Sequence, residues 1–110
     1  MTFLEDANKH LKKKTEIAER AIEAKFVAYA TKKKCKAMKL VLLLGKGFPD
    51  RTVLCPGGKV LFIEFKRKGK KLSMTQKSIR NILVEMGFSY TLCDEIGQAE
   101  KILDNAMETA

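Results

Sequence analysis

The sequence predicts an α/β fold in which a mixed four-stranded sheet is flanked by helices, in the order α-β-β-β-α-β-α. Three observations support this fold class. Residues Phe3 to Lys34 contain neither glycine nor proline and are rich in Ala, Glu, Lys and Leu, which is typical of a long helix. Two short β-prone segments flank Pro56-Gly57-Gly58, a hairpin signal. The second of these segments is followed by a helix and another strand, and such a crossover makes the last pair of strands parallel.

Length and composition favour one domain over positions 1–110. Of the 110 residues, 45% are hydrophobic and 32% charged, which is typical of globular rather than disordered proteins. The longest apolar run, Leu40 to Leu44, is far shorter than the roughly 20 residues that cross a bilayer, so we expect no membrane partner. The start of the chain, with Glu5 and Asp6, does not fit a secretory signal. We therefore expect a cytoplasmic protein, located in the host cytoplasm if a phage encodes it.

The charge balance points to a polyanionic partner. Lys and Arg number 22 and Asp and Glu 13, which gives a formal net charge of +9. Cations that neutralise phosphates release condensed counterions, so this excess favours nucleic acid, although a solvated basic surface would give the same count. The cysteines, Cys35, Cys55 and Cys93, are odd in number and far apart. This spacing argues against a disulfide framework and against a zinc site.

The first helix and the segment after it are predicted from local patterns. The helix should end near Lys34, and a break near Lys14-Thr15 is compatible with its composition. The helix is expected to face the core through apolar positions on two neighbouring strips, namely Ile17, Ala21, Ala24 and Ala28 on one, with Ile22, Phe26 and Tyr29 beside it. A β-rich segment covers Lys36 to Leu44, and Gly45-Lys46-Gly47-Phe48-Pro49 then suits a tight loop that another segment can approach closely.

The second half alternates strands and helices. Strands are expected at Arg51 to Cys55, Lys59 to Lys66 and Phe88 to Cys93. After a basic loop, Ser73-Met74-Thr75-Gln76 fits a capping box and opens a helix that should end near Met86, with Gly87 as its stop. A closing amphipathic helix follows Asp94 and is expected to turn three apolar residues inward, Ile96, Ile102 and Leu103.

The hairpin brings two carboxylates together if it is symmetric about its turn. Asp50 and Glu64 each lie seven residues from Gly57, so they would be directly opposed. Opposed carboxylates repel unless a cation lies between them, and a hard divalent ion such as Mg²⁺ suits that place. Lys66 shares the strand face of Glu64 and is suited to orient a water, or to stabilise charge as that water attacks a phosphate.

These residues also have plainer explanations. Pro49-Asp50 is a common turn, and the Glu64-x-Lys66 pattern is a frequent ion pair on a strand. Glu23 adds a third acid on the apolar stripe of the first helix, but an exposed edge charge would look the same, and Glu19 is an equal candidate. The residues alone leave these alternatives open.

Gln76 is ambiguous in the same way. Capping explains it fully, yet a polar group at a helix N-terminus is also suited to face a phosphate or a water. In the second case Ser73, Thr75 and the lysines at positions 68, 70 and 71 would line the approach to the same edge.

One combined pattern runs through most of the chain, from about Ile17 to Leu103. Its most specific part is the string from Gly47 to Arg51, followed by the hairpin over Gly57 to Phe65 and by Lys66, and it includes Ile22-Glu23, Lys39, Gly69-Lys70-Lys71-Leu72 and Gln76. This combination resembles the virus-type replication-repair nuclease family, VRR-NUC, of the PD-(D/E)XK nuclease superfamily. Met74 departs from the pattern, because family members often carry proline there.

The resemblance implies a restriction-endonuclease-like core and metal-dependent hydrolysis of phosphodiester bonds in DNA. It implies that Asp50 and Glu64 bind Mg²⁺ or Mn²⁺ together with the backbone carbonyl of Phe65. In the same way, Lys66 would position the nucleophilic water, and Glu23 would complete the acidic cluster directly or through water.

Further residues and partners are implied by the same resemblance. Gln76 would support the site, and DNA would be contacted by Lys46, Arg51, Lys68, Lys70 and Lys71. Small members that stand alone look like homodimers that cut branched DNA such as four-way (Holliday) junctions, where two-fold symmetry matches a symmetric substrate. The expected function is therefore that of a structure-selective endonuclease in DNA repair.

The competing hypothesis is a non-catalytic nucleic-acid-binding module on the same basic scaffold. Such a module has no use for three acids at matching places, because without a metal they repel phosphate. A titration with Mn²⁺ separates the two hypotheses. A peripheral membrane protein is disfavoured because the lysine-rich segments lack interleaved Trp and Phe.

Overall fold

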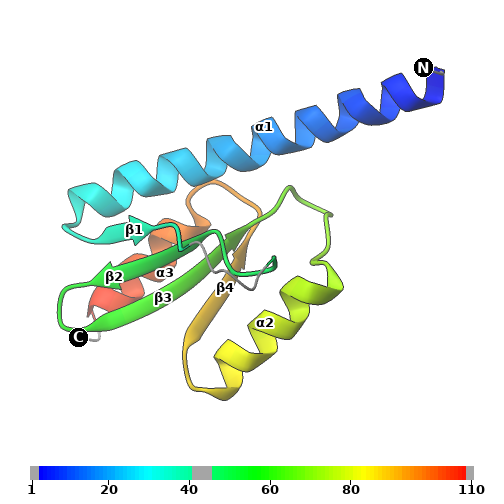
Figure 1. Ribbon diagram of the computed structural model, residues 1–110. Helices are drawn as coiled ribbons and strands as arrows, with labels where there is room; N and C mark the ends of the chain where they lie inside the picture. Colours follow the sequence, from blue (N-terminus) through cyan, green and yellow to red (C-terminus); the bar gives the residue numbers. More distant parts are fainter. Residues whose placement is uncertain (1–2, 41–45, 109–110) are drawn as a thin grey trace.

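The computed structural model describes residues 3–40 and 46–108, with side chains from residue 16 onward, and confirms the predicted fold class (Figure 1). Three helices and four strands follow one another in the predicted order α-β-β-β-α-β-α. They are α1 (Phe3–Lys32), β1 (Lys36–Met38), β2 (Arg51–Cys55), β3 (Lys59–Phe65), α2 (Met74–Glu85), β4 (Ser89–Cys93) and α3 (Gln98–Glu108).

The four strands form one sheet in the order β1-β2-β3-β4. β1, β2 and β3 pair antiparallel, whereas β4 returns through α2 and pairs parallel with β3, as the crossover predicted. In the β2–β3 ladder Arg51 pairs with Ile63 and Cys55 with Lys59, which is the register of a hairpin symmetric about Gly57. Gly57 has φ +87° in the turn, where the Gly58 N–H donates to the Cys55 carbonyl at 3.2 Å.

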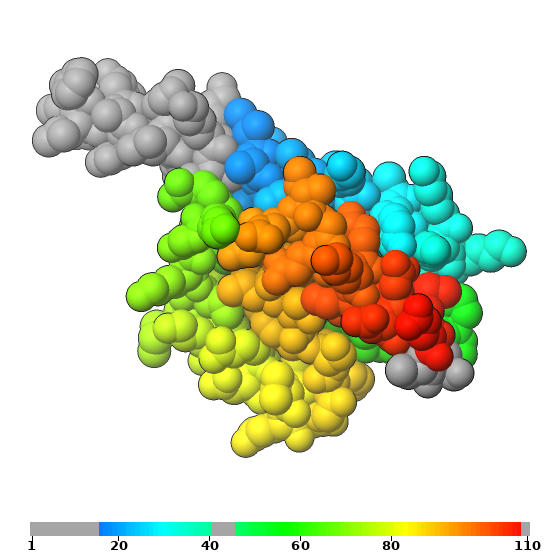
Figure 2. Space-filling view, turned by 180° about the vertical axis from the view of Figure 1, so that it is seen from behind, coloured from blue at the N-terminus to red at the C-terminus, as the bar shows by residue number. Residues whose placement is uncertain are grey.

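The helices divide between the two faces of the sheet. α1 and α3 contact each other and β3 on one face, and Figure 2 shows them side by side there, α1 in blue to cyan and α3 in orange to red. Leu61, Ile63 and Phe65 of β3 point into that layer and belong to one buried cluster with Phe26 of α1 and Leu103 of α3. Glu64 alternates to the other face, where α2 contacts β4.

The first helix differs from the prediction at three places. α1 is continuous through Lys14-Thr15 and ends at Lys32. Lys34 adopts the left-handed conformation (φ +63°), and the Cys35 N–H donates to the Ala30 carbonyl at 3.0 Å, which closes the helix. Of the two strips predicted to face the core, the first does not: Ile17 is 56% exposed, and Ala21, Ala24 and Ala28 are exposed. The neighbouring stripe packs instead, because it carries the larger apolar surfaces, those of Ile22, Phe26 and Tyr29, together with Ala30.

Two further boundaries and one side chain also differ. β1 ends at Met38, and the later part of the segment predicted as strand, positions 41–44, lies outside the described residues. β3 ends at Phe65 rather than at Lys66. Ile96 is 59% exposed because it lies in the turn before α3, whose inward face begins with Ala99. The capping box at Ser73 and the stop after Met86 are as predicted.

Two other sequence-based expectations concern the cysteines and a membrane span. The three cysteines are free thiols and all are buried. Among the helices of the described residues, none combines the length and the apolarity needed to span a bilayer.

Candidate active site

An acidic pair lies at the end of the β2–β3 hairpin that is farthest from its turn. Asp50 directly precedes β2, and Glu64 is the penultimate residue of β3. The Asp50 N–H donates to Oε1 of Glu64 at 3.1 Å, and the Phe65 N–H donates to Oδ2 of Asp50 at 2.8 Å. The two carboxylates therefore meet as the hairpin symmetry predicted, and backbone donors fix both.

Gly47 holds the loop before Asp50 against the first turn of α2. Its φ of +99° is a left-handed conformation that glycine adopts at little cost. A β-carbon at Gly47 would lie 2.7 Å from Cγ2 and 2.9 Å from the carbonyl carbon of Thr75, too close for any side chain. Phe48 then packs edge-on against Phe62 of β3, with ring centroids 5.6 Å apart. This close approach brings the Asp50 loop and the start of α2 to one corner of the sheet.

Burial makes the acidic pair costly to ionise. Glu64 is only 3% exposed. Burial and the nearby charge of Asp50 raise the pKa of Glu64 to about 8. Burial also raises the pKa of Asp50, although the Phe65 N–H acts in the opposite direction. Without a cation, the pair retains a proton at neutral pH.

Lys66 and Gln76 both contact the same oxygen of Glu64. Lys66 is 8% exposed, and its Nζ lies 3.6 Å from Oε2 of Glu64. Nε2 of Gln76 donates to that oxygen at 2.8 Å, while Oε1 of Gln76 accepts from the Ser73 N–H at 2.9 Å. The amide oxygen completes the capping box, as one of the two alternatives predicted, and the amide nitrogen contacts the acidic pair.

Glu23 lies beside the pair and is held by an arginine. Nε of Arg51 donates to Oε2 of Glu23 at 2.7 Å, and Nη1 of Arg51 donates to the Ala37 carbonyl at 3.0 Å. The Glu23 side chain is 14% exposed, with Lys39 at 3.8 Å, and its charge contributes to raising the pKa of Asp50. Across residues 16–40 and 46–108 no three Asp, Glu, His or Cys side chains gather closely enough to hold a metal. Glu23 is thus near the pair but engaged with Arg51.

Glu19, the other candidate for a third acid, serves a different segment. Its Oε1 accepts from the Arg67 N–H at 3.2 Å and lies 3.5 Å from Nζ of Lys70. Glu19 therefore holds the basic loop after β3 against α1.

The cations predicted to contact DNA fall into two groups. Lys46 and Lys71 are exposed. The other three form ion pairs: Lys68 with Glu95 at 2.9 Å, Lys70 with Glu19 and Arg51 with Glu23. The pairs of Lys68 and Lys70 are at the surface, where such contacts contribute little and exchange readily. Arg51 is different, because it is 19% exposed and bonded on two sides.

Two residues near the pair were missed in the sequence. Arg80 lies one helical turn after Gln76 on α2, and Tyr90 lies on β4, paired with Phe62. Burial and the charge of Glu64 raise the pKa of Tyr90 to about 12, and the charge of Arg80 lowers it. The i+4 spacing from Gln76 was the one available signal for Arg80. Tyr90 had none, because only the strand pairing brings it there.

The donor set suits a hard divalent cation. Two adjacent carboxyl groups with raised pKa values and a backbone carbonyl at Phe65 are oxygen ligands of the kind that Mg²⁺ and Mn²⁺ take. Mg²⁺ is commonly bound by one or two carboxylates, with water and substrate phosphate completing its shell, so two acids are enough. The residues present therefore fit the ion that the sequence resemblance implied.

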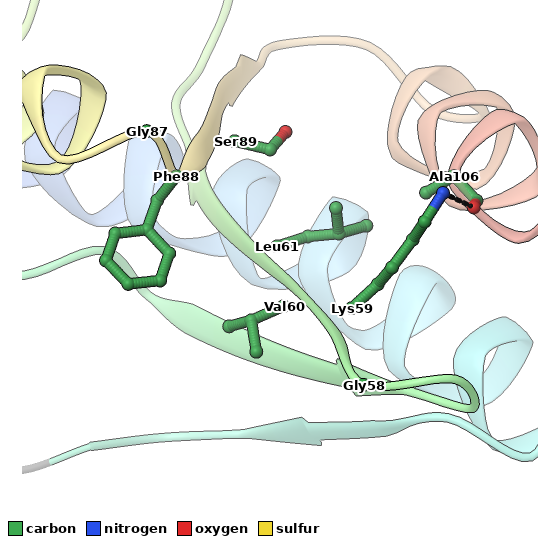
Figure 3. Close-up of a pocket in the computed structure, with 8 residues that line it drawn as sticks. All are labelled: Gly58, Lys59, Val60, Leu61, Gly87, Phe88, Ser89 and Ala106. Carbon is green, nitrogen blue, oxygen red and sulfur yellow. Dashed lines mark hydrogen bonds between the residues drawn. The ribbon is translucent and has the colours of Figure 1, made fainter. Parts of the chain in front are cut away.

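The opposite end of β3 holds a hollow without acidic side chains. It is lined by Gly58, Lys59, Val60, Leu61, Gly87, Phe88, Ser89 and Ala106 (Figure 3). The side chain of Lys59 crosses this hollow, and its Nζ donates to the Ala106 carbonyl at 2.7 Å. This carbonyl lies near the C-terminus of α3, where a cation is favourable. This hollow lies at the turn end of the hairpin, away from Asp50 and Glu64.

Comparison with solved structures supports the fold class. The structure is similar to one titled "VRR_NUC domain", with a TM-score of 0.73 and 19% sequence identity, over 79% of this chain and 95% of that one. The sequence matches no family model and no curated protein. At this identity the likeness shows the fold: the mixed four-stranded sheet and the α-β-β-β-α-β-α order are those of a VRR_NUC domain.

Proposed function

We propose that the chain is a metal-dependent endonuclease that hydrolyses phosphodiester bonds in DNA. The observation that carries this proposal is the pair of half-buried Asp50 and buried Glu64, with Lys66 in contact with Glu64, on a VRR_NUC fold. Burial raises the pKa of both carboxyl groups, and the charge of Asp50 raises the pKa of Glu64 further, so ionisation of the pair is favoured by a metal cation between them. The net charge of +9 supports a phosphate-rich substrate.

Asp50 and Glu64, with the Phe65 carbonyl, would hold Mg²⁺ or Mn²⁺. Such an ion lowers the pKa of a bound water and neutralises charge on the reacting phosphate. Gln76 fixes the Glu64 carboxylate, as partners of metal ligands generally do. Lys66 is the residue suited to orient the attacking water and to stabilise the charge that develops on the phosphate oxygens, because its ammonium group is buried beside Glu64.

Glu23 would not contact the reacting atoms directly. It holds Arg51 and adds negative charge near Asp50. It would contact the bound metal ion through a water rather than directly. We therefore treat Glu23 as a positioning residue.

We further propose branched DNA, such as a four-way junction, as the substrate and a homodimer as the active form. Two sites related by a dyad can incise a symmetric junction symmetrically. The end of α2 exposes large apolar side chains that support a second copy docking there, namely Ile82, Val84, Met86 and the following Phe88. Light scattering measures the oligomeric state directly.

The test uses labelled single-stranded, duplex, forked and four-way DNA with Mg²⁺, Mn²⁺ or EDTA. We expect metal-dependent cleavage, fastest on the four-way junction, and none in EDTA. Lys66→Ala should cut no substrate yet bind DNA as the wild type does. Binding without cleavage of any substrate by the wild type would contradict the proposal and favour the non-catalytic binding module.

A further inference from the structure

One stripe of α2 begins at the acidic pair. Gln76, Arg80 and the buried Leu83 are spaced four and three residues apart, so they share the face of the helix that packs on the sheet. Gln76 contacts Glu64 directly, and Arg80 follows about 6 Å along the helix axis. A cation therefore sits on the sheet-facing stripe, immediately beyond the residue that contacts the acidic pair.

Arg80 has no carboxylate partner in the part of the chain that the structure describes. Its Nε and Nη2 each lie 3.3 Å from the side-chain oxygen of Asn81, a neutral group. Arg51, the arginine next to Asp50, is bonded to Glu23 at 2.7 Å. Arg80 is half-buried yet keeps its charge uncompensated, which leaves its planar set of donors available to an anion.

Tyr90 approaches the same place from β4. It pairs with Phe62, and Leu92 pairs with Glu64, so alternation along the strands puts Tyr90 on the face of Glu64. Its hydroxyl feels the charges of Glu64, Asp50 and Arg80, so Tyr90 lies within electrostatic reach of the acidic pair and of Arg80. With its pKa raised to about 12, Tyr90 remains a hydrogen-bond donor at neutral pH.

We propose that Arg80 and Tyr90 form a phosphate-binding subsite beside the acidic pair, which holds a backbone phosphate of the DNA strand next to the phosphate that is cut. This inference rests on the proposed function. A DNA strand that approaches two carboxylates is repelled by them, and a guanidinium with a neighbouring hydroxyl offsets that repulsion while matching phosphate geometry. The subsite would fix which phosphate lies over Asp50 and Glu64.

The test measures DNA binding in Ca²⁺, which is expected to occupy the site without supporting cleavage, over a series of salt concentrations. Arg80→Gln should weaken binding about 10-fold and reduce the slope of log K against log salt by about one. Lys101→Gln, which removes one exposed charge from α3 on the other face, is the matched control and should change binding less than twofold. Equal binding by Arg80→Gln and Lys101→Gln would overturn the subsite.

Two further variants guard against misfolding and separate the roles. Arg80→Lys keeps the charge and should fall between the wild type and Arg80→Gln, and Tyr90→Phe should weaken binding about threefold. In cleavage assays all three should raise KM with kcat within about threefold, and Mn²⁺ binding by calorimetry should be unchanged. A loss of kcat at unchanged KM would also overturn the subsite. If the wild type cuts no DNA, the proposed function fails, while the binding comparison still decides whether Arg80 contacts phosphate.

Discussion

Two acidic corners of the molecule differ in how their charge is balanced. At one, Glu23 of α1 is bonded to Arg51 at 2.7 Å, with Lys39 at 3.8 Å, so the carboxylate has its cations within the protein. At the other, Asp50 and Glu64 face each other, and their nearest cation, Lys66, lies 3.6 Å from only one of them. At the first corner one carboxylate has two cations beside it, whereas at the second two carboxyl groups share one.

Chain geometry explains why adjacent residues belong to different corners. Arg51 pairs with Ile63, whose side chain lies in the layer of α1, and Arg51 reaches Glu23 there. Asp50, one residue earlier, instead meets Glu64 and the Phe65 N–H. Under the proposed function, the acids that bind the metal are those without an arginine partner, and the experiments below compare the two corners and their neighbours.

The largest expected effect separates Asp50 from Glu23 in catalysis. Asp50→Asn removes a metal ligand and should lower the rate of DNA cleavage at least about 1,000-fold. Glu23→Gln removes only a positioning group and should cost about 10–100-fold, the range found for residues that orient metal ligands. Initial rates in saturating Mg²⁺ measure both. If Glu23→Gln loses as much as Asp50→Asn, the two corners act as one site and the distinction is wrong.

The second effect concerns stability at the Glu23–Arg51 corner. Arg51→Leu leaves the largely buried Glu23 without its arginine and should lower the free energy of unfolding by about 2 kcal/mol. This loss is smaller than that for breaking a fully buried ion pair, because both side chains are partly exposed. The double variant Glu23→Gln with Arg51→Leu should recover part of that loss. Urea unfolding of the wild type, Arg51→Leu and the double variant measures these free energies. Lys39→Gln is the control and should change little, and a Lys39 effect as large as that of Arg51 would contradict the account.

The third comparison uses the two ends of one capping box. Ser73→Ala and Gln76→Ala each remove one of its hydrogen bonds and should each cost about 1 kcal/mol of stability. Only Gln76→Ala also frees the Glu64 carboxylate, so only it should slow cleavage, by about 10-fold. Thermal unfolding and cleavage rates measured on the same samples test this split. Equal rates for the two variants would show that Gln76 acts on the helix alone.

The last comparison is the pH dependence of stability without metal. The pKa of Glu64 is raised from 4.5 in the unfolded chain to about 8 in the fold. Its contribution to stability is therefore fully present below about pH 4.5 and is lost as the pH rises towards 8. In EDTA, Tm of the wild type should fall by several degrees over this interval relative to that of Glu64→Gln. Parallel curves for the two proteins would show that Glu64 ionises normally.

Local chemistry made much of the site predictable. Pro56-Gly57-Gly58 sets the turn, the turn sets the register, and the register places Asp50 against Glu64. Ser73 and Gln76 likewise define the start of α2 by contacts within one turn. Each of these steps depends on residues that are close in sequence or on strand pairing fixed by a tight loop.

Contacts between distant elements were not predictable in the same way. Two adjacent apolar stripes run along α1, and only packing against β3 and α3 selects the one with Phe26 rather than the one with Ile17. Arg51 was expected to face DNA, yet α1 brings Glu23 within reach of it. Tyr90 comes near Glu64 only because β4 pairs parallel with β3.

The most direct test of the central claim is calorimetric titration with Mn²⁺ at pH 7 in two buffers of different ionisation enthalpy. Because the raised pKa of Glu64 keeps a proton on the pair at this pH, we expect the wild type to bind Mn²⁺ and to release about one proton. Asp50→Asn should give no binding heat, and Glu23→Gln should still bind. Binding that survives Asp50→Asn, or wild-type binding with no proton released, would contradict the account.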